Sequence, residues 1–181
     1  DSGTDTVTDL GTGSDILVVS SGATANATNV SSFTATSATR NSGTATINSV
    51  AGGSTVDMSS SGLGGFTLAG NAGVDNLTGG SNNDIITGAG GNDIIIGGAG
   101  NDSITGGANN DSLTGSAGND TFNVDSGTDT ITDLGTDNDV LVVSSGATAN
   151  ATNVSSFTAT SGTSNSGTAT LTAASGGGTI N

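Results

Sequence analysis

Seven consecutive nine-residue units occupy residues 70–132, and their two constant positions restrict the fold of this chain more than any other feature. The sixth position is always aspartate, and the eighth is always a large apolar residue. The aspartates are Asp75, Asp84, Asp93, Asp102, Asp111, Asp120 and Asp129, and the apolar residues are Leu77, Ile86, Ile95, Ile104, Leu113, Phe122 and Ile131. Two residue types kept at one period throughout this stretch indicate a repeat architecture.

Each unit divides into a turn-forming part and a strand-forming part. The first five positions are mostly Gly, Ala, Ser and Asn, which tolerate tight turns. The last three positions place one apolar residue between small or polar ones, as in a short strand with one inward face. A turn of about six residues followed by a strand of about three predicts a coil whose parallel strands stack at ~4.8 Å. We therefore predict an all-β parallel β-solenoid or β-roll without helix.

Stacking such coils brings the sixth-position aspartates of successive turns close together. Neighbouring carboxylates repel each other unless a cation lies between them. Carboxylate and carbonyl oxygens on an adaptable backbone suit calcium better than the smaller, strictly octahedral magnesium. The sequence therefore predicts Ca²⁺ as a cofactor, with the seven aspartates of the repeat as ligands.

Two units, GGAGNDSIT (97–105) and GGANNDSLT (106–114), are the clearest examples of the pattern. They resemble the glycine-rich calcium-binding nonapeptide of the repeats-in-toxin (RTX) proteins, G-G-x-G-x-D-x-U-x, in which U is a large apolar residue. The resemblance implies a β-roll in which two units make one turn and the loops form two columns. One column would hold Asp75, Asp93, Asp111 and Asp129, and the other Asp84, Asp102 and Asp120.

One ion between each consecutive pair in a column gives about five calcium ions, three in one column and two in the other. We expect turn carbonyls to supply further ligands, with candidates at Gly80, Gly91, Gly98, Gly100, Gly107 and Gly118. Departures from the pattern predict weaker positions at both ends of the roll. Asn71 and Val74 alter the first unit, and Val124 and Asp125 replace the leading glycines of the last.

A longer repeat surrounds the nonapeptides. Residues 1–34 recur at 125–158 with four changes, and residues 35–57 recur more loosely at 159–181, at the same offset. We therefore predict four segments: the end of a preceding roll and its flank (1–15), irregular solenoid coils (16–69), the calcium-binding roll (70–132) and the start of the next tandem unit (133–181, repeating 9–57). We expect an array of such units that continues past both ends of this segment.

The flanks of the roll contain further candidate metal ligands. Asp5 is the equivalent of Asp129 in the longer repeat. Asp133 and Asp139 follow the last nonapeptide and have the spacing to close the final calcium site. A solvated acidic turn is the alternative interpretation of this flank.

The composition restricts the classes of partner. All 16 acidic residues are Asp, and Arg40 is the single basic residue, so that the net charge is −15. This charge disfavours nucleic acid and anionic membranes and favours cations. Only 31% of the residues are apolar, which suits a thin solenoid better than a thick globular core. No apolar run is long enough for membrane insertion. A disordered linker is the alternative, but disorder requires no apolar residue at every eighth position.

The residue types present also restrict the function. The chain has no His, Glu, Cys, Lys or Tyr, so the usual catalytic bases and nucleophiles are missing and we predict that it is not an enzyme. Near-identical tandem units predict a structural repeat of an extracellular surface layer, sheath or filament that self-associates. The alternatives are the stalk of a calcium-dependent adhesin and a secretion-assisting roll of a toxin or exoenzyme. Three Thr-x-Thr pairs would suit a flat face that binds ice or a sugar such as a cell-surface glycan, although β-propensity explains such pairs more simply. The pairs are Thr34/Thr36, Thr44/Thr46 and Thr168/Thr170.

Overall fold

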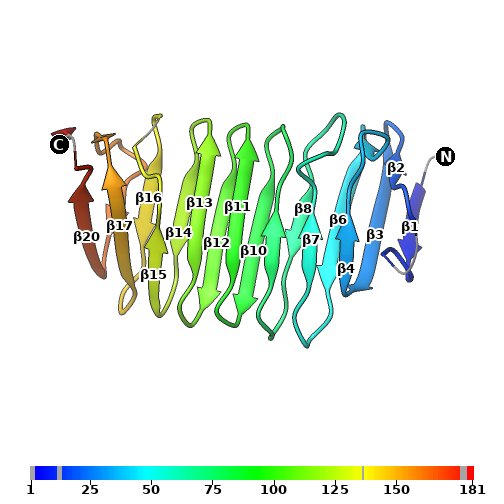
Figure 1. Cartoon of the computed structure of the whole chain (residues 1–181), viewed down its shortest axis with the longest axis horizontal. Helices are drawn as coiled ribbons and strands as arrows, with labels where there is room; N and C mark the ends of the chain where they lie inside the picture. The colour runs from blue at the N-terminus through cyan, green and yellow to red at the C-terminus, as the bar shows by residue number, and fades with distance from the viewer. Residues whose placement is uncertain (1–2, 12–13, 136, 176–178) are drawn as a thin grey trace.

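The computed structural model describes residues 3–11, 14–135, 137–175 and 179–181. This part of the chain forms 21 β-strands and no helix, so none of its segments is a helix able to span a membrane. The strands wind into an elongated parallel solenoid with the two termini at opposite ends (Figure 1). Two long sheets of nine and eight strands form its faces, and two small sheets have two strands each. The predicted all-β parallel solenoid is confirmed.

The nonapeptides form the middle of the solenoid, where each turn contains two strands. One face carries β10 (Ile85–Gly90), β12 (Ser103–Ala108) and β14 (Thr121–Val124), and the other carries β9 (Asn76–Thr78), β11 (Ile94–Ala99), β13 (Ser112–Ala117) and β15 (Thr128–Ile131). Ile86 lies opposite Ile104 on one face, and Ile95 lies opposite Leu113 on the other. The members of each pair are two units apart in the sequence, so two units make one turn.

The division of each unit into strand and turn differs from the expectation. Strands β10 to β13 have six residues rather than about three, because each continues through the first three positions of the next unit. Pairing of β10 with β12 skips Gly88 and Gly106 and resumes where Ala89 lies opposite Gly107. These second-position residues have φ of 77° and 103°, so the backbone bends there and then rejoins the ladder. The turn proper is therefore only about three residues long.

The eighth-position side chains form the interior of the roll. All seven are at most 1% exposed, and their neighbours on either side are intermediate or exposed. They point inward because successive side chains of a strand alternate between its two faces. Each nine-residue unit thus contributes one large apolar side chain to a narrow core between the two sheets.

The coils on the N-terminal side of the roll are wider than the nonapeptide coils. Their strands are β2 (Val18–Val19), β3 (Ala23–Val30), β4 (Ser32–Thr34), β5 (Arg40–Asn41), β6 (Thr44–Ser49), β7 (Thr55–Asp57) and, leading into the roll, β8 (Thr67–Ala69). β2 pairs with β5, β3 with β6 and β4 with β7, so each strand pairs with the third strand after it. Each of these coils therefore contains three strands. The longest of these strands is β3, with eight residues.

The longer sequence repeat recurs as a structural repeat. β1 (Gly3–Val7) corresponds to β15, and the later elements are β16 (Val140–Val143), β17 (Thr148–Val154), β18 (Ser156–Phe157), β19 (Ser164–Asn165), β20 (Thr168–Ala173) and β21 (Thr179–Ile180). Equivalent strands do not share a sheet, however: β3 and β6 belong to the nine-stranded sheet, whereas β17 and β20 belong to the eight-stranded sheet.

Candidate metal centre

The sixth-position aspartates form two columns along the roll, joined by hydrogen bonds between successive turns. The backbone N–H of Asp84 donates to Oδ1 of Asp102 (2.7 Å), and that of Asp102 donates to Oδ1 of Asp120 (2.8 Å). The other column has the same bonds from Asp75 to Asp93 (2.8 Å), from Asp93 to Asp111 (2.8 Å) and from Asp111 to Asp129 (3.0 Å). All seven aspartates are at most 3% exposed. The structure therefore brings together the two columns that the RTX resemblance implied.

The second carboxylate oxygen of most of these aspartates has no hydrogen-bond partner. Among the described residues, the buried and unpartnered carboxylate oxygens are Oδ1 of Asp75 and Oδ2 of Asp93, Asp102, Asp111 and Asp129. Burying an unpaired carboxylate is costly, and native structures avoid it unless a cation or metal ion is bound. This row of orphaned oxygens is therefore the structural signature of a cation site.

The first-position glycines leave space beside these oxygens. A Cβ at Gly106 would collide with Oδ2 of Asp111 and would lie 3.0 Å from Oδ2 of Asp129. A Cβ at Gly97 would collide with Oδ2 of Asp102 and would lie 2.8 Å from the carbonyl oxygen of Gly115. The space thus lies between carboxylates of successive turns and is also faced by a backbone carbonyl. A donor set made only of oxygens fits Ca²⁺.

Two of the six carbonyl ligands expected from the sequence accept hydrogen bonds. The carbonyl of Gly80 accepts a bond from the N–H of Ala99 (2.9 Å), and that of Gly107 accepts one from Oγ of Ser126 (3.1 Å). For Gly91, Gly98, Gly100 and Gly118, the carbonyl ligands stay a prediction. The carbonyls beside the orphaned oxygens belong instead to first-position glycines such as Gly106 and Gly115. The signal for them was present, since six of the seven units begin with Gly.

The carbonyls are necessary because the carboxylates alone are too few at each position. Within the described part of the chain, no group of three or more acidic side chains is arranged to hold a metal ion. Each position between two turns therefore offers two aspartates and backbone oxygens.

Burial makes ionisation of these aspartates unfavourable in the absence of a cation. It raises the pKa of Asp93 and Asp120 from 3.8 to about 6, and that of Asp102 and Asp129 to about 7. Desolvation is the largest cause, and the neighbouring carboxylates raise the pKa further. The pKa values of Asp84, Asp111 and Asp139 are raised by burial as well. A divalent cation between the turns would remove both penalties.

The aspartates that follow the last nonapeptide extend this arrangement. Asp139 is 3% exposed, and its Oδ1 accepts a bond from the N–H of Asp120 (3.0 Å), so that it occupies the next position in that column. Its Oδ2 accepts from the N–H of Gly135 (2.8 Å). Asp133 accepts bonds from the N–H groups of Gly115 (3.0 Å) and Ser116 (2.6 Å). A solvated acidic turn therefore does not describe Asp139.

The N-terminal flank differs from its copy. Asp5 lies opposite Ala25 as Asp129 lies opposite Ala149, which confirms that they are equivalent positions. Asp5 is exposed, however, whereas Asp129 is fully buried. Asp129 is buried because its strand, β15, lies between β13 and β17. The strand of Asp5, β1, pairs only with β3 among the described strands, so one of its sides is open. The structure therefore does not bring Asp5 to a column of aspartates.

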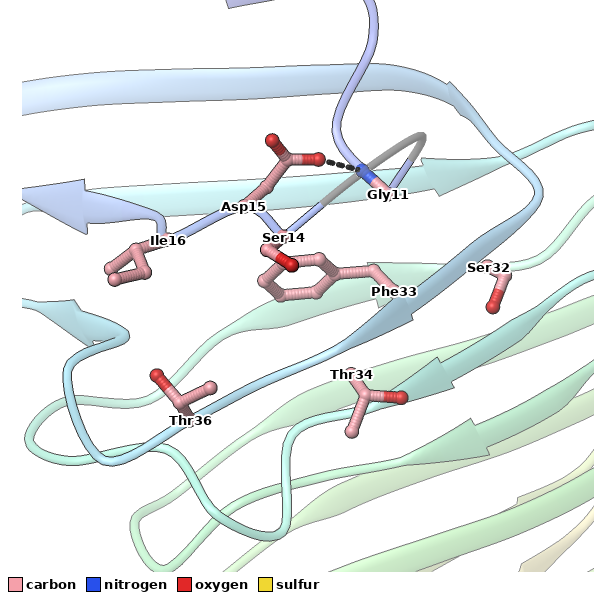
Figure 2. A pocket seen from close by; sticks show the side chains of 8 residues that line it. All are labelled: Gly11, Ser14, Asp15, Ile16, Ser32, Phe33, Thr34 and Thr36. Carbon is pink, nitrogen blue, oxygen red and sulfur yellow. Dashed lines mark hydrogen bonds between the residues drawn. The ribbon is translucent and has the colours of Figure 1, made fainter.

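A cavity of about 380 Å³ lies beside this flank (Figure 2). Among the described residues, Asp15 is the only ionisable one that lines it, and Oδ2 of Asp15 accepts a hydrogen bond from the N–H of Gly11 (2.7 Å). The same bond joins Gly135 to Asp139 in the second copy. This lining lacks the paired carboxylates of the roll.

Comparison with known proteins supports this assignment. The family model for the RTX calcium-binding nonapeptide repeat matches residues 69–104 and 96–131. The chain therefore contains RTX calcium-binding nonapeptide repeats, and the match covers residues 69–131, about a third of its 181 residues. No curated protein and no solved structure matches the chain.

Proposed function

We propose that this chain is a structural segment of an extracellular protein, folded by Ca²⁺ and assembled through tandem units into a surface layer, sheath or filament. The observation that carries this proposal is the row of buried, unpartnered carboxylate oxygens along the roll. The chain has one basic residue against 16 acidic ones, so its own side chains cannot neutralise that row. RTX repeat proteins are typically secreted, and extracellular fluid contains millimolar calcium.

The ligands follow from the two columns. The first column contains Asp75, Asp93, Asp111 and Asp129, and it offers three positions between successive aspartates. The second contains Asp84, Asp102, Asp120 and Asp139, and it offers three more. First-position carbonyls add backbone oxygens. We thus expect six ions, one more than the nonapeptides alone would hold.

A dependence on calcium would also delay folding of the roll until after export from the cell. At the micromolar or lower calcium concentration of a cytoplasm, sites of the weak extracellular class (about 10⁻⁴–10⁻³ M) would stay empty and the repelling aspartates would keep the roll unfolded. Outside the cell, calcium would fill the columns and fold the roll. A chain that folds only after export suits a protein that assembles at a surface.

Two further features support a structural role. The chain has no His, Glu, Cys, Lys or Tyr, the residues that most often act as catalytic bases and nucleophiles. The tandem copies at 1–34 and 125–158 are nearly identical, as expected for building material. Parallel solenoids stack end to end through their open strand edges, and this is the self-association that we propose.

The elongated shape favours a second candidate, the stalk of a calcium-dependent adhesin. The termini lie at opposite ends of the solenoid, so tandem units would form a long spacer (Figure 1). Electron microscopy in calcium separates the two candidates. Regular lateral or helical order supports a layer or filament, and isolated rods that end in a distinct tip support a stalk.

A calcium titration tests the proposed function itself. In chelator the chain should lose the β-signal of the roll by circular dichroism and keep that of the wider coils. Millimolar Ca²⁺ should restore the lost signal cooperatively, whereas equimolar Mg²⁺ should restore much less. A β-signal that is already complete in chelator at neutral pH would contradict the proposal.

A further inference from the structure

A second ladder of side chains runs beside the aspartates. The fifth position of five nonapeptides is asparagine, and its side-chain oxygen accepts the backbone N–H of the fifth-position residue one turn later. These bonds run from Asn101 to Asn83 (2.8 Å), from Asn119 to Asn101 (2.9 Å), from Asn110 to Asn92 (3.0 Å) and from Thr128 to Asn110 (2.8 Å), and Asn138 continues the series to Asn119 (3.0 Å). These five asparagines, with Asn138, are exposed, so they do not belong to the core.

The asparagine bonds run in the opposite direction to the aspartate bonds. Between two successive turns, the N–H of Asn101 donates back to Asn83, whereas the N–H of Asp84 donates forward to Asp102. Adjacent residues of each loop therefore hold the next loop by two bonds of opposite polarity. Such a pair restricts both the separation of the loops and their tilt. The second carboxylate oxygen takes part in neither bond, so its distance from the next aspartate depends on this spacing.

One position in the roll lacks the asparagine bond. The fifth residue of the first unit is Val74, which is 57% exposed and has no side-chain oxygen. Of the two side-chain bonds that join successive loops elsewhere in the roll, the loops of Asp75 and Asp93 therefore have the aspartate bond (2.8 Å) and lack the asparagine bond. Asp75 also differs in its free oxygen, because the N–H of Asn71 donates to its Oδ2 (3.0 Å) and leaves Oδ1 unpartnered.

We propose that the fifth-position asparagines are positioning residues for the calcium sites, which set the spacing of the loops and hence the size of cation that each aspartate pair holds. The position between Asp75 and Asp93 is accordingly the weakest and the least selective for ion size. Asparagine suits this role because it supplies the acceptor without adding a negative charge beside the column. The inference rests on the proposed binding of calcium by the roll.

The test compares Ca²⁺ with the larger Sr²⁺. Asn101→Ala removes the acceptor, Asn101→Asp keeps an acceptor oxygen, and Asn76→Ala removes an exposed asparagine outside the ladder as a control. Affinities for both ions are measured on the whole chain by competition with Tb³⁺ luminescence. Asn101→Ala should lower the calcium affinity about tenfold, as expected for losing a hydrogen bond that orders the site. It should also reduce the ratio of calcium to strontium affinity, and Asn101→Asp should restore that ratio.

A gain-of-function variant keeps the test decisive if Asn101→Ala folds poorly. Val74→Asn should tighten the weakest class of sites several-fold and raise its calcium-to-strontium ratio. A fall in both affinities by the same factor in Asn101→Ala, or an unchanged ratio in both variants, would overturn the inference, because the asparagines would then stabilise only the fold. Absence of calcium binding in the unmodified chain is a different result: it would refute the proposed function, and the inference with it.

Discussion

The roll and the coils on its N-terminal side share a parallel topology but fill their interiors differently. The roll closes each turn with two nonapeptides and two strands, and it buries two carboxylates per turn. Each of the wider coils contains three strands, and these coils bury neutral polar groups in place of carboxylates. There, Nδ2 of Asn41 donates to the carbonyl of Gly65 (2.6 Å), and Oγ of Ser54 donates to that of Val30 (2.6 Å).

The two regions also differ in how many apolar side chains they bury. The wider coils bury closely spaced apolar side chains, among them Ala27, Val30, Phe33, Ile47 and Val56. The roll buries one large apolar side chain in each nonapeptide. Apolar burial is the main favourable contribution to folding, so we expect the wider coils to close on their own side chains and the roll to depend on a cation. The comparison thus sets a region of denser apolar packing against a region of buried carboxylates.

Removal of calcium should produce the largest difference between the roll and the wider coils. In chelator, we expect amide hydrogen exchange over residues 85–124 to accelerate at least about a hundredfold, because local opening there no longer releases bound ions. Exchange over β3 and β6 should accelerate much less. Mass spectrometry of peptic peptides measures both segments in one experiment. Equal acceleration in the two regions would show that the wider coils need the ion as well.

Asp102→Ala should have the next largest effect. The carboxylate of Asp102 faces the turns on both sides, through the bond from Asp84 and through its free Oδ2. We expect the loss of two ions in a titration followed by mass spectrometry and a rise of about tenfold or more in the calcium concentration needed to fold the chain. The matched control is Asp57→Ala in the wider coils, which should leave both quantities unchanged. Loss of a single ion would mean that each aspartate serves only one position.

A methyl group placed in the proposed site should have a smaller effect. Gly97→Ala puts a Cβ against Oδ2 of Asp102, whereas Gly52→Ala in the wider coils puts one into open space. We expect Gly97→Ala to weaken calcium binding several-fold in a luminescence titration and Gly52→Ala to leave it unchanged. Equal effects of the two substitutions would place the ion away from the first-position glycine.

Acid should stabilise the metal-free roll modestly. The pKa of Asp102 and Asp129 is about 7 in the folded chain, above the ordinary 3.8, so the folded state binds more protons between these values. That stabilisation is fully present below about pH 4 and is lost as the pH rises through 6 to 7. In chelator, we therefore expect more β-structure by circular dichroism at pH 5 than at pH 7.5.

Calcium should reverse this pH dependence. Protons compete with the cation for the same carboxylates, so the calcium concentration needed for folding should rise as the pH falls from 7.5 to 5. Parallel curves with and without calcium would show that the ion binds elsewhere than at the buried aspartates.

Several features of the fold and of the candidate site were predictable from the nonapeptide period. Asp at the sixth position and an apolar residue at the eighth predicted the parallel solenoid and the inward face of each strand. The RTX resemblance predicted the two columns. The flank spacing gave Asp139 as a candidate ligand for the last site, with a solvated acidic turn as the alternative, and the structure decided between them. Asp5 and the second- and fourth-position carbonyls were less predictable, since their surroundings depend on which turns stack against them.

The local pattern alone determined which residues turn, which form strands and which carry the acid, because these properties belong to each nonapeptide. Only the tertiary structure decided that the strands have six residues, that first-position carbonyls face the carboxylates and that asparagines join the loops. It also decided that the wider coils have three strands and that their two copies lie in different sheets. These features arise from contacts between residues one whole turn apart. The sequence repeat specifies the structure within a turn but not the packing of one turn on the next.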